Sequence, residues 1–198
     1  MTGVAVIDAG GANLGSVCYA LERQGVTPSI VRDPDGLRDM DRVILPGVGA
    51  AAPAMALLRH RGFDVALRNM QAPLLGICLG MQLLFESSED GNVDCLGLLP
   101  GHVRRMRPMD GVRVPHMGWN RLRDICVSAP LLRGIMDGAH AYFVHGYAVP
   151  VTVDCIASCS HGARFSAVVQ RGTICGAQFH PERSATAGAR LLANFLAG

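Results

Sequence analysis

Lysine is missing from the 198 residues of this sequence, so all 18 basic residues are arginines, and 16 acidic residues balance them. The resulting net charge of +2 leaves no basic surplus of the kind that draws proteins to nucleic-acid phosphates. No stretch approaches the roughly 18 consecutive apolar residues that a membrane-spanning helix needs. We therefore expect neither nucleic acid nor a membrane as a partner.

A basic leader is also missing, because no charged residue precedes the first apolar run at 4–7. This argues against a secretion signal and favours a cytoplasmic protein. The seven cysteines are an odd, scattered set, for which reduced thiols are the expectation. Cys155, Cys159 and His161 lie close in sequence, but 151–159 has the pattern of a strand whose thiols face the core. We expect no metal and no cofactor.

Aromatic residues are scarce at 5%, yet apolar residues make up 49% of the chain, which at this length suffices for a sizeable core. We expect one domain, 1–198. Its first half alternates strands and helices, and its second half, from about Gly97, has short strands and turns. Such alternation predicts an α/β fold, with a mostly parallel sheet covered by helices on both faces and a smaller antiparallel region.

The expected elements are set by apolar runs and by turn residues between them. A glycine-rich turn at 9–12 follows the first strand, and Asn13 is the expected N-cap of the first helix, which Gly25 ends. The expected strands are 4–7, 27–31, 42–45 and 74–77, the hairpin strands are 165–170 and 173–179, and the helices are 13–24, a segment through Leu58, and 184–196.

One cysteine occupies a special position, because Cys78 stands between Gly76 and Gly80 directly after an apolar strand. A glycine two residues to either side is what a tight strand-to-helix turn requires when a nucleophile is at its tip. A lone cysteine in an apolar run is usually just a small buried residue. The two glycines at this element boundary instead indicate a catalytic thiol.

A base for this thiol is available at Gln178-Phe179-His180-Pro181-Glu182. His180 can take up the thiol proton, and Glu182 can accept the far N–H of the imidazole. Two residues apart on an extended strand, these side chains would point the same way. The N–H of Leu79 and the Gly47–Gly49 loop are candidate donors to an oxyanion. We therefore predict a Cys–His–Glu enzyme that transfers acyl groups.

These segments, 76–82 and 178–184, resemble the class I (triad) glutamine amidotransferases. The segments 8–16 and 45–55 are also similar to that family. Within it, Pro115-His116-Met117-Gly118-Trp119-Asn120 with Tyr142-Phe143-Val144-His145 resembles the glutaminase subunits of imidazole glycerol phosphate synthase in histidine biosynthesis. The resemblance implies a flavodoxin-like three-layer fold and covers nearly the whole chain, from Asp8 to Phe195.

The resemblance also implies roles for individual residues. Glutamine would be hydrolysed through a thioester on Cys78, with His180 as acid and base and Glu182 as its partner. The ammonia would pass to a (βα)₈-barrel cyclase subunit in a heterodimer. The implied oxyanion-hole residues are Val48, Gly49 and Leu79, the glutamine-binding residues are Gln82, Asp90, Gly146 and Tyr147, and the partner-interface residues are Asn13, Trp119, Tyr142 and Arg183.

Alternative interpretations remain open at this stage. A related glutaminase could serve another acceptor synthase with the same catalytic residues, and a cysteine peptidase would share only the nucleophile. A non-catalytic partner subunit could keep the fold, although it has no use for all of Cys78, His180 and Glu182. Trp119 alone would ordinarily be assigned to the core rather than to an interface.

Overall fold

The computed structural model describes residues 3–10 and 13–198 of the chain. At its centre is a seven-stranded sheet in the order β11-β12-β13-β4-β3-β1-β2. Strands β13, β4, β3, β1 and β2 run parallel, and β11 and β12 add an antiparallel edge. Their bounds are β1 Val4–Ile7, β2 Ser29–Val31, β3 Arg42–Gly47, β4 Leu74–Cys78, β11 Cys155–His161, β12 Ala163–Arg171 and β13 Ile174–Ala177. This confirms the mostly parallel α/β architecture.

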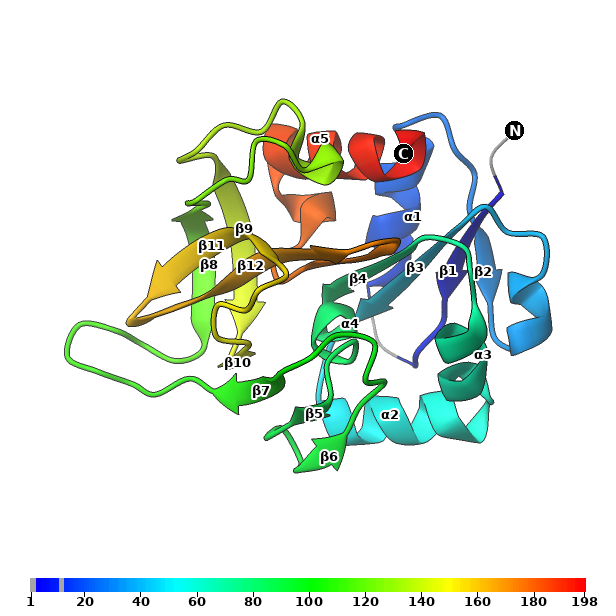
Figure 1. The fold of residues 1–198 in the computed structure, drawn as a ribbon, viewed down its shortest axis with the longest axis horizontal. Coiled ribbons are helices and arrows are strands. Elements are labelled where there is room, and N and C mark those ends of the chain that lie inside the picture. Colours follow the sequence, from blue (N-terminus) through cyan, green and yellow to red (C-terminus); the bar gives the residue numbers. More distant parts are fainter. Residues whose placement is uncertain (1–2, 11–12) are drawn as a thin grey trace.

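Helices cover both faces of this sheet, as Figure 1 shows. Helices α1 and α5 pack on one face, and α2 and α3 on the other. The strand residues alternate accordingly: Val4 and Val6 pack with α1 and α5, whereas Ala5 and Ile7 pack with α2 and α3. Two buried faces explain why these strands are apolar throughout. The helices are α1 Leu14–Glu22, α2 Ala51–His60, α3 Phe63–Asn69, the single turn α4 Leu79–Gln82, and α5 Ala185–Ala197.

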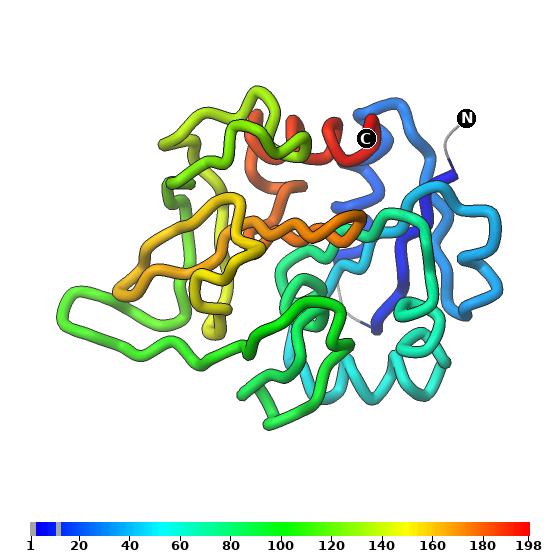
Figure 2. The backbone as a smooth tube through the Cα atoms, in the orientation of Figure 1, coloured from blue at the N-terminus to red at the C-terminus, as the bar shows by residue number. Residues whose placement is uncertain are grey.

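Two smaller sheets lie beside the antiparallel edge, and the backbone tube in Figure 2 follows the chain through them. One is four-stranded, in the order β10-β7-β5-β6, and the other is the pair β8-β9. The bounds are β5 Ser87–Ser88, β6 Val93–Asp94, β7 His102–Arg105, β8 His116–Arg121, β9 His140–His145 and β10 Tyr147–Ala148. Short 3₁₀ turns occupy η1 Pro34–Leu37, η2 Pro130–Leu132 and η3 Pro181–Arg183.

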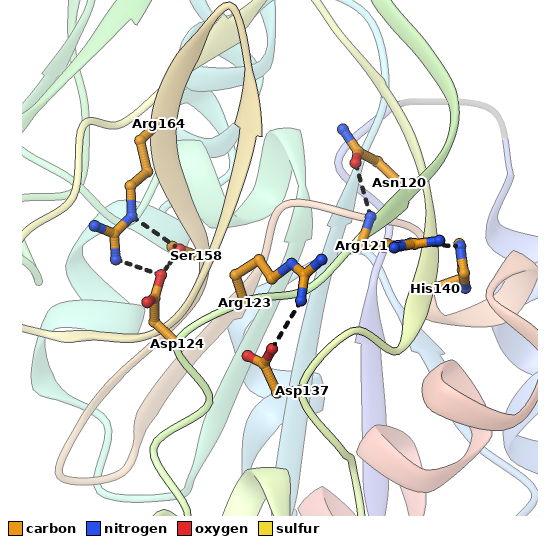
Figure 3. Close-up of polar contacts among 8 residues, drawn as sticks. All are labelled: Asn120, Arg121, Arg123, Asp124, Asp137, His140, Ser158 and Arg164. Atoms are coloured by element: carbon orange, nitrogen blue, oxygen red, sulfur yellow. Dashed lines mark hydrogen bonds and ion pairs between the residues drawn. The ribbon is translucent and has the colours of Figure 1, made fainter.

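The chain just beyond β8 is fastened to β11, as Figure 3 shows. Arg123 and Ser158 exchange two backbone hydrogen bonds of 2.8 Å. Asp124 accepts from Ser158 and Arg164, and Arg123 pairs with Asp137 at 3.0 Å. Solvent screens ion pairs this exposed, so the two backbone hydrogen bonds contribute most to holding this segment against β11. The β8-β9 ribbon thereby has a fixed position at the end of the sheet.

Most expected elements occur where the sequence indicated, and two of the expectations differ in detail. The expected strand at 151–159 begins only at Cys155, because a turn precedes it in which Cys155 N donates to Thr152 O at 3.1 Å. Asn13 stands at the N-cap of α1 but makes no capping bond with its side chain, and its φ of 88° is left-handed. Gly11 and Ala12, in the expected glycine-rich turn, lie outside the described residues.

None of the helices in the described part of the chain is both long enough and apolar enough to cross a membrane.

Candidate active site

The turn at Cys78 is so tight that it requires the glycines on either side of it. Cys78 ends β4 with φ 53° and ψ −110°, a strained conformation for a residue with a side chain. A Cβ on Gly80 would lie 1.8 Å from the carbonyl oxygen of Leu45, and one on Gly76 would lie 2.7 Å from Gly80 O. No side chain fits at either position. The helix that follows, α4, has a single turn, so its dipole contributes little to activating the thiol.

His180 and Glu182 meet through a local turn. Their side chains lie 2.8 Å apart, Nδ1 to Oε1, but Glu182 belongs to η3 rather than to an extended strand. The strand expected at 173–179 ends at Ala177, and Pro181 starts the 3₁₀ turn. Within it the carboxylate folds back onto the ring of His180. The backbone of His180 is held by Tyr142 O, which accepts its N–H at 3.0 Å, and by Ser184 Oγ, which donates to its carbonyl at 2.7 Å.

The electrostatics of the site favour a charged imidazole. Burial by itself lowers the pKa of His180, but hydrogen bonds and charge interactions with Cys78 and Glu182 outweigh it and raise that pKa to about 10. An imidazolium held beside Cys78 stabilises the thiolate, which is the reactive form of a cysteine. The pair is enclosed, since Cys78 and His180 are each only 6% exposed. The arrangement is that of an activated thiol nucleophile with its acid–base partner.

Gln178 is a contact of the thiol to which sequence reasoning gave no role. Its side chain is fully buried, and its Nε2 lies 3.9 Å from Cys78 Sγ. Gln82 orients it by donating from Nε2 to Gln178 Oε1 at 3.0 Å and to Tyr147 O at 2.9 Å. A signal was available, because residues two apart along extended chain share a face and Gln178 is two before His180.

One cavity of about 350 Å³ collects the residues expected to act on and bind the substrate. Cys78 and His180, the expected catalytic pair, lie in its wall, and Glu182 lies behind His180 with its side chain 1% exposed. The lining residues are Val48, Gly49, Ala50, Cys78, Leu79, Gln82, Asp90, Pro115, Val144, His145, Gly146, Tyr147 and His180. All of the residues expected for the oxyanion hole and for glutamine binding are therefore brought together in one cavity.

The loop after β3 forms the wall of the cavity beside Leu79. Gly49 has φ 96°, a conformation that favours glycine, and a Cβ there would face open space. Asp90 Oδ2 accepts the backbone N–H of Ala51 at 2.8 Å, at the start of α2. Asp90 therefore caps that helix from another part of the chain, in addition to lining the cavity.

A neutral polar network, also without an assigned role in the sequence interpretation, extends from His145 in the cavity wall to His116 and Asn120. His145 Nδ1 bonds Tyr147 O at 2.8 Å, and its Nε2 bonds His116 Nδ1 at 3.1 Å. Asn120 Nδ2 lies 3.2 Å from His116 Nε2. Burial, the largest influence on each, lowers the pKa of His145 to about 4 and that of His116 to about 3. Both rings are neutral at pH 7, and a proton on Nδ1 of each satisfies the whole chain of bonds.

An exposed aromatic surface adjoins the triad. Trp119 is 54% exposed, so the assignment of this residue to the core is wrong. Its ring makes an edge-on contact with Tyr142 at 5.8 Å between centroids, and the guanidinium of Arg183 lies 5.8 Å from the centre of the Tyr142 ring. Asn13 differs from these three residues, because its Nδ2 donates inward to Glu182 Oε1 at 2.6 Å.

Known proteins that are similar to this chain identify its family. The family model described as "Glutamine amidotransferase class-I" matches residues 5–198. The protein named "Imidazole glycerol phosphate synthase subunit HisH" from Xanthomonas oryzae pv. oryzae (strain MAFF 311018) is 65% identical over 99% of this chain and 98% of its own. The chain belongs to the class I glutamine amidotransferases, in the HisH family. It is therefore a glutamine amidotransferase subunit of the histidine-biosynthesis type.

Other relatives of this HisH-family chain agree. The subunit of the same name from Xylella fastidiosa (strain Temecula1 / ATCC 700964) is 63% identical over 99% of this chain and 98% of its own. Among solved structures, one described as "glutamine amidotransferase" has a TM-score of 0.76 at 23% identity and covers 98% of each chain. A glutamine amidotransferase from Thermotoga maritima has a TM-score of 0.65 at 18% identity, covering 91% of this chain and 76% of its own. These two structures support the fold alone.

The two free cysteines of β11 in this amidotransferase, Cys155 and Cys159, differ in burial. Cys159 is buried in the core, and burial raises its pKa to about 11, whereas Cys155 is half-buried. Within the described part of the chain, His, Cys, Asp and Glu side chains form no group of three or more that would hold a metal ion.

Proposed function

We propose that this chain hydrolyses glutamine to glutamate and ammonia through a thioester on Cys78, as the glutaminase subunit of imidazole glycerol phosphate synthase. The observation that carries the proposal is the position of His180, which interacts with both Cys78 and the buried carboxylate of Glu182 in the wall of one cavity. The 65% identity to a HisH subunit supports the choice of substrate and pathway.

The reaction follows from the charges at the site. The Cys78 thiolate attacks the side-chain amide carbon of glutamine, and the carbonyl oxygen becomes an oxyanion. We assign the N–H of Leu79 and the Val48–Gly49 peptide, both of which line the cavity, as donors to this oxyanion, and one such donor is typically worth about 10²–10³ in rate. The imidazolium of His180 gives its proton to the departing nitrogen, which leaves as ammonia. The neutral ring then takes a proton from water, which hydrolyses the thioester to glutamate and the free thiol.

The cavity offers suitable groups for the two ends of the amino acid. Gln82 uses its Nε2 within the protein, so its Oε1 is left to accept from the substrate α-amino group. One carboxylate oxygen of Asp90 accepts from Ala51 N. The other oxygen is left to accept from the same α-amino group of the substrate. The backbone of Gly146 and Tyr147 is the site for the α-carboxylate.

Ammonia chemistry accounts for the proposed partner. In water at neutral pH ammonia becomes ammonium, which is not a nucleophile, so it must travel through a dry passage to its acceptor. The exposed surface of Trp119, Tyr142 and Arg183 adjoins the triad and is suited to a tight protein contact. We assign it to a (βα)₈-barrel cyclase subunit of a cytoplasmic heterodimer. There the ammonia joins a phosphoribulosyl-formimino intermediate, which yields imidazole glycerol phosphate and releases an aminoimidazole carboxamide ribonucleotide.

Glutaminase turnover of the purified chain, alone and with the barrel cyclase plus its nucleotide ligand, tests this proposal. We expect low turnover alone, strong stimulation in the complex, and none from Cys78→Ala in either condition. The Cys78→Ala complex should still bind its partner and use added ammonia. Turnover that ignores the cyclase would assign the chain to another synthase. No turnover from a folded chain in either condition would make it a non-catalytic subunit.

A further inference from the structure

The acid of the triad is held by a residue far away in sequence. Glu182 Oε1 accepts from His180 Nδ1 at 2.8 Å and also from Asn13 Nδ2 at 2.6 Å, across 169 positions of the chain. The Glu182 side chain is 1% exposed, so bulk water does not solvate it. A carboxylate this buried needs several donors if it is to stay ionised. Asn13 supplies one of the two that reach Oε1.

The conformation of Asn13 matches this contact better than it matches helix capping. Its φ of 88° is left-handed, a region that asparagine enters more readily than most residues with a side chain. It stands at the N-cap of α1 yet makes no capping bond with its side chain. Because the amide is turned away from its own helix and toward η3, the start of α1 is used to reach the triad.

We propose that Asn13 is a positioning residue for catalysis, which fixes Glu182 and through it the orientation and charge of His180. Its donated bond holds Oε1 in the one place where it also meets the imidazole N–H. Without that bond the carboxylate can rotate within η3, and the ring loses its fixed partner. The groups that raise the pKa of His180 are Cys78 and Glu182, whereas the neighbouring His145 is neutral at pH 7, and Asn13 bonds to Glu182 directly.

This role deepens the proposed function, on which it rests, because Asn13 was expected to face the cyclase. Asn13 precedes the first residue of α1 and also bonds to the carboxylate of Glu182, so a partner that contacts this end of α1 would reach the triad through one side chain. A bound cyclase that fixes Asn13 would fix Glu182 in the same step. The proposal therefore locates part of the stimulation by the partner at one side-chain contact.

Two substitutions separate positioning from other roles. Asn13→Gly keeps the left-handed backbone without strain and removes the donor. Asn13→Asp keeps the size of the side chain and remains a good N-cap, but its carboxylate cannot donate to Glu182 and repels it. Ser16→Ala is the matched control, because Ser16 is exposed on the same helix. All variants carry Cys126→Ser, since hydrogen bonding from Ser128 lowers the pKa of Cys126 and would make that thiol a competing target.

The first measurement is the rate of Cys78 alkylation by iodoacetamide against pH in the isolated chain, read by peptide mass spectrometry. Both Asn13 variants should react about 10-fold or more slowly near neutral pH, with the midpoint of the profile moved upward, as expected for losing one bond to a charged group. Ser16→Ala should match the parent. The second measurement, turnover with saturating cyclase, should show the loss in kcat with KM for glutamine unchanged.

The outcomes are distinguishable. Folded Asn13 variants whose alkylation profile and kcat stay within 2-fold of the parent, a margin of about 0.4 kcal/mol, would overturn the positioning role. A loss that appears only as weaker cyclase binding would assign Asn13 to the interface alone. If the parent chain proves to have no glutaminase activity, the proposed function fails, but the alkylation profiles still decide whether Asn13 controls the thiol.

Discussion

Two buried histidines line the same cavity, yet at neutral pH one is positively charged and the other is neutral. His180 and His145 are each 6% exposed, yet the pKa of His180 is raised to about 10 and that of His145 is lowered to about 4. Burial, the largest single influence on both, lowers each pKa. His180 has a thiol and a carboxylate as neighbours, whereas His145 has a backbone carbonyl and the neutral His116. The bonding partners decide the charge, and depth alone does not.

This difference divides the cavity into two regions with separate duties. The region of His180 is the one we propose to move protons, and the imidazole ring there interacts with two ionisable groups, Cys78 and Glu182. The region of His145 stays neutral and fixes the carbonyl of Tyr147, which in turn holds Gln82. A permanent second charge beside the imidazolium would oppose it, so the neutral network protects the triad as well as supporting the substrate pocket.

The largest predicted effect on kcat comes from removing the charged histidine. His180→Ala deletes the acid–base group, and the glutaminase kcat should fall by about 10²–10⁴-fold. His145→Ala deletes a supporting group, so its main effect should be on KM for glutamine and on thermal stability. Steady-state kinetics of both variants with the cyclase present make the comparison. A kcat loss for His145→Ala as large as that for His180→Ala would show that the two regions do not have separate duties.

A smaller effect on kcat is expected from removing the negative charge of Glu182. Glu182→Gln keeps an oxygen that can accept from both His180 and Asn13 but removes the charge that favours the imidazolium. We expect a kcat loss of about 10-fold to 10²-fold, the range for losing a charge-assisted interaction, and therefore a milder defect than that of His180→Ala. The pH profile of kcat/KM should also shift. Equal losses from the two variants would mean that the charge of Glu182, and not its geometry, is the main contribution.

Much of the charged region could be predicted because it is local in sequence. Gly76 and Gly80 flank Cys78 at an element boundary, and their absent side chains are now explained by contacts with Leu45 and the elbow itself. The apolar runs of the parallel strands were equally clear, since both faces of each are buried. Local order of this kind leaves a pattern that hydrophobicity and turn residues reveal.

The remaining features depend on pairings that no local pattern reveals. The network of His145 requires the antiparallel register that places His116 opposite it in β8-β9. The contact from Asn13 to Glu182 requires α1 and η3 to meet, and the sequence interpretation assigned Asn13 first to a helix cap. The exposure of Trp119 depends on which face of β8 is covered. In each case the deciding neighbour lies far along the chain.

The neutral region makes a prediction about stability in acid. The unfolded chain has ordinary histidines with a pKa near 6.5, whereas the folded pKa values are about 4 for His145 and about 3 for His116. Between pH 6.5 and 4 the unfolded state binds protons that the folded state does not, so the free energy of unfolding falls as the pH falls. At pH 5 the loss is about 2 kcal/mol for each histidine.

Urea unfolding at pH 7 and pH 5 measures this loss. His116→Gln should lower stability at pH 7 but should make the decrease toward pH 5 smaller by about 2 kcal/mol. His60→Gln, at an exposed position of α2, is the control and should leave the decrease unchanged. An unaltered decrease in His116→Gln would show that His116 is not held neutral. His180 acts in the opposite direction, because stability from its raised pKa is present below pH 6.5 and is lost as the pH rises through about 10.

The smallest predicted effect concerns a glycine beside the neutral histidine. A Cβ on Gly146 would come no nearer than 3.9 Å to Pro115 and Val114, which is ordinary contact. Gly146→Ser should therefore change the free energy of unfolding by less than about 0.5 kcal/mol and KM for glutamine by less than about 2-fold. Gly80→Ser is the contrasting variant, because its Cβ would lie 1.8 Å from Leu45 O, and it should not fold. A stable Gly146→Ser enzyme with a much higher KM would mean that the α-carboxylate of the substrate needs the space that Gly146 leaves, and the neutral region would then select the substrate as well as support it.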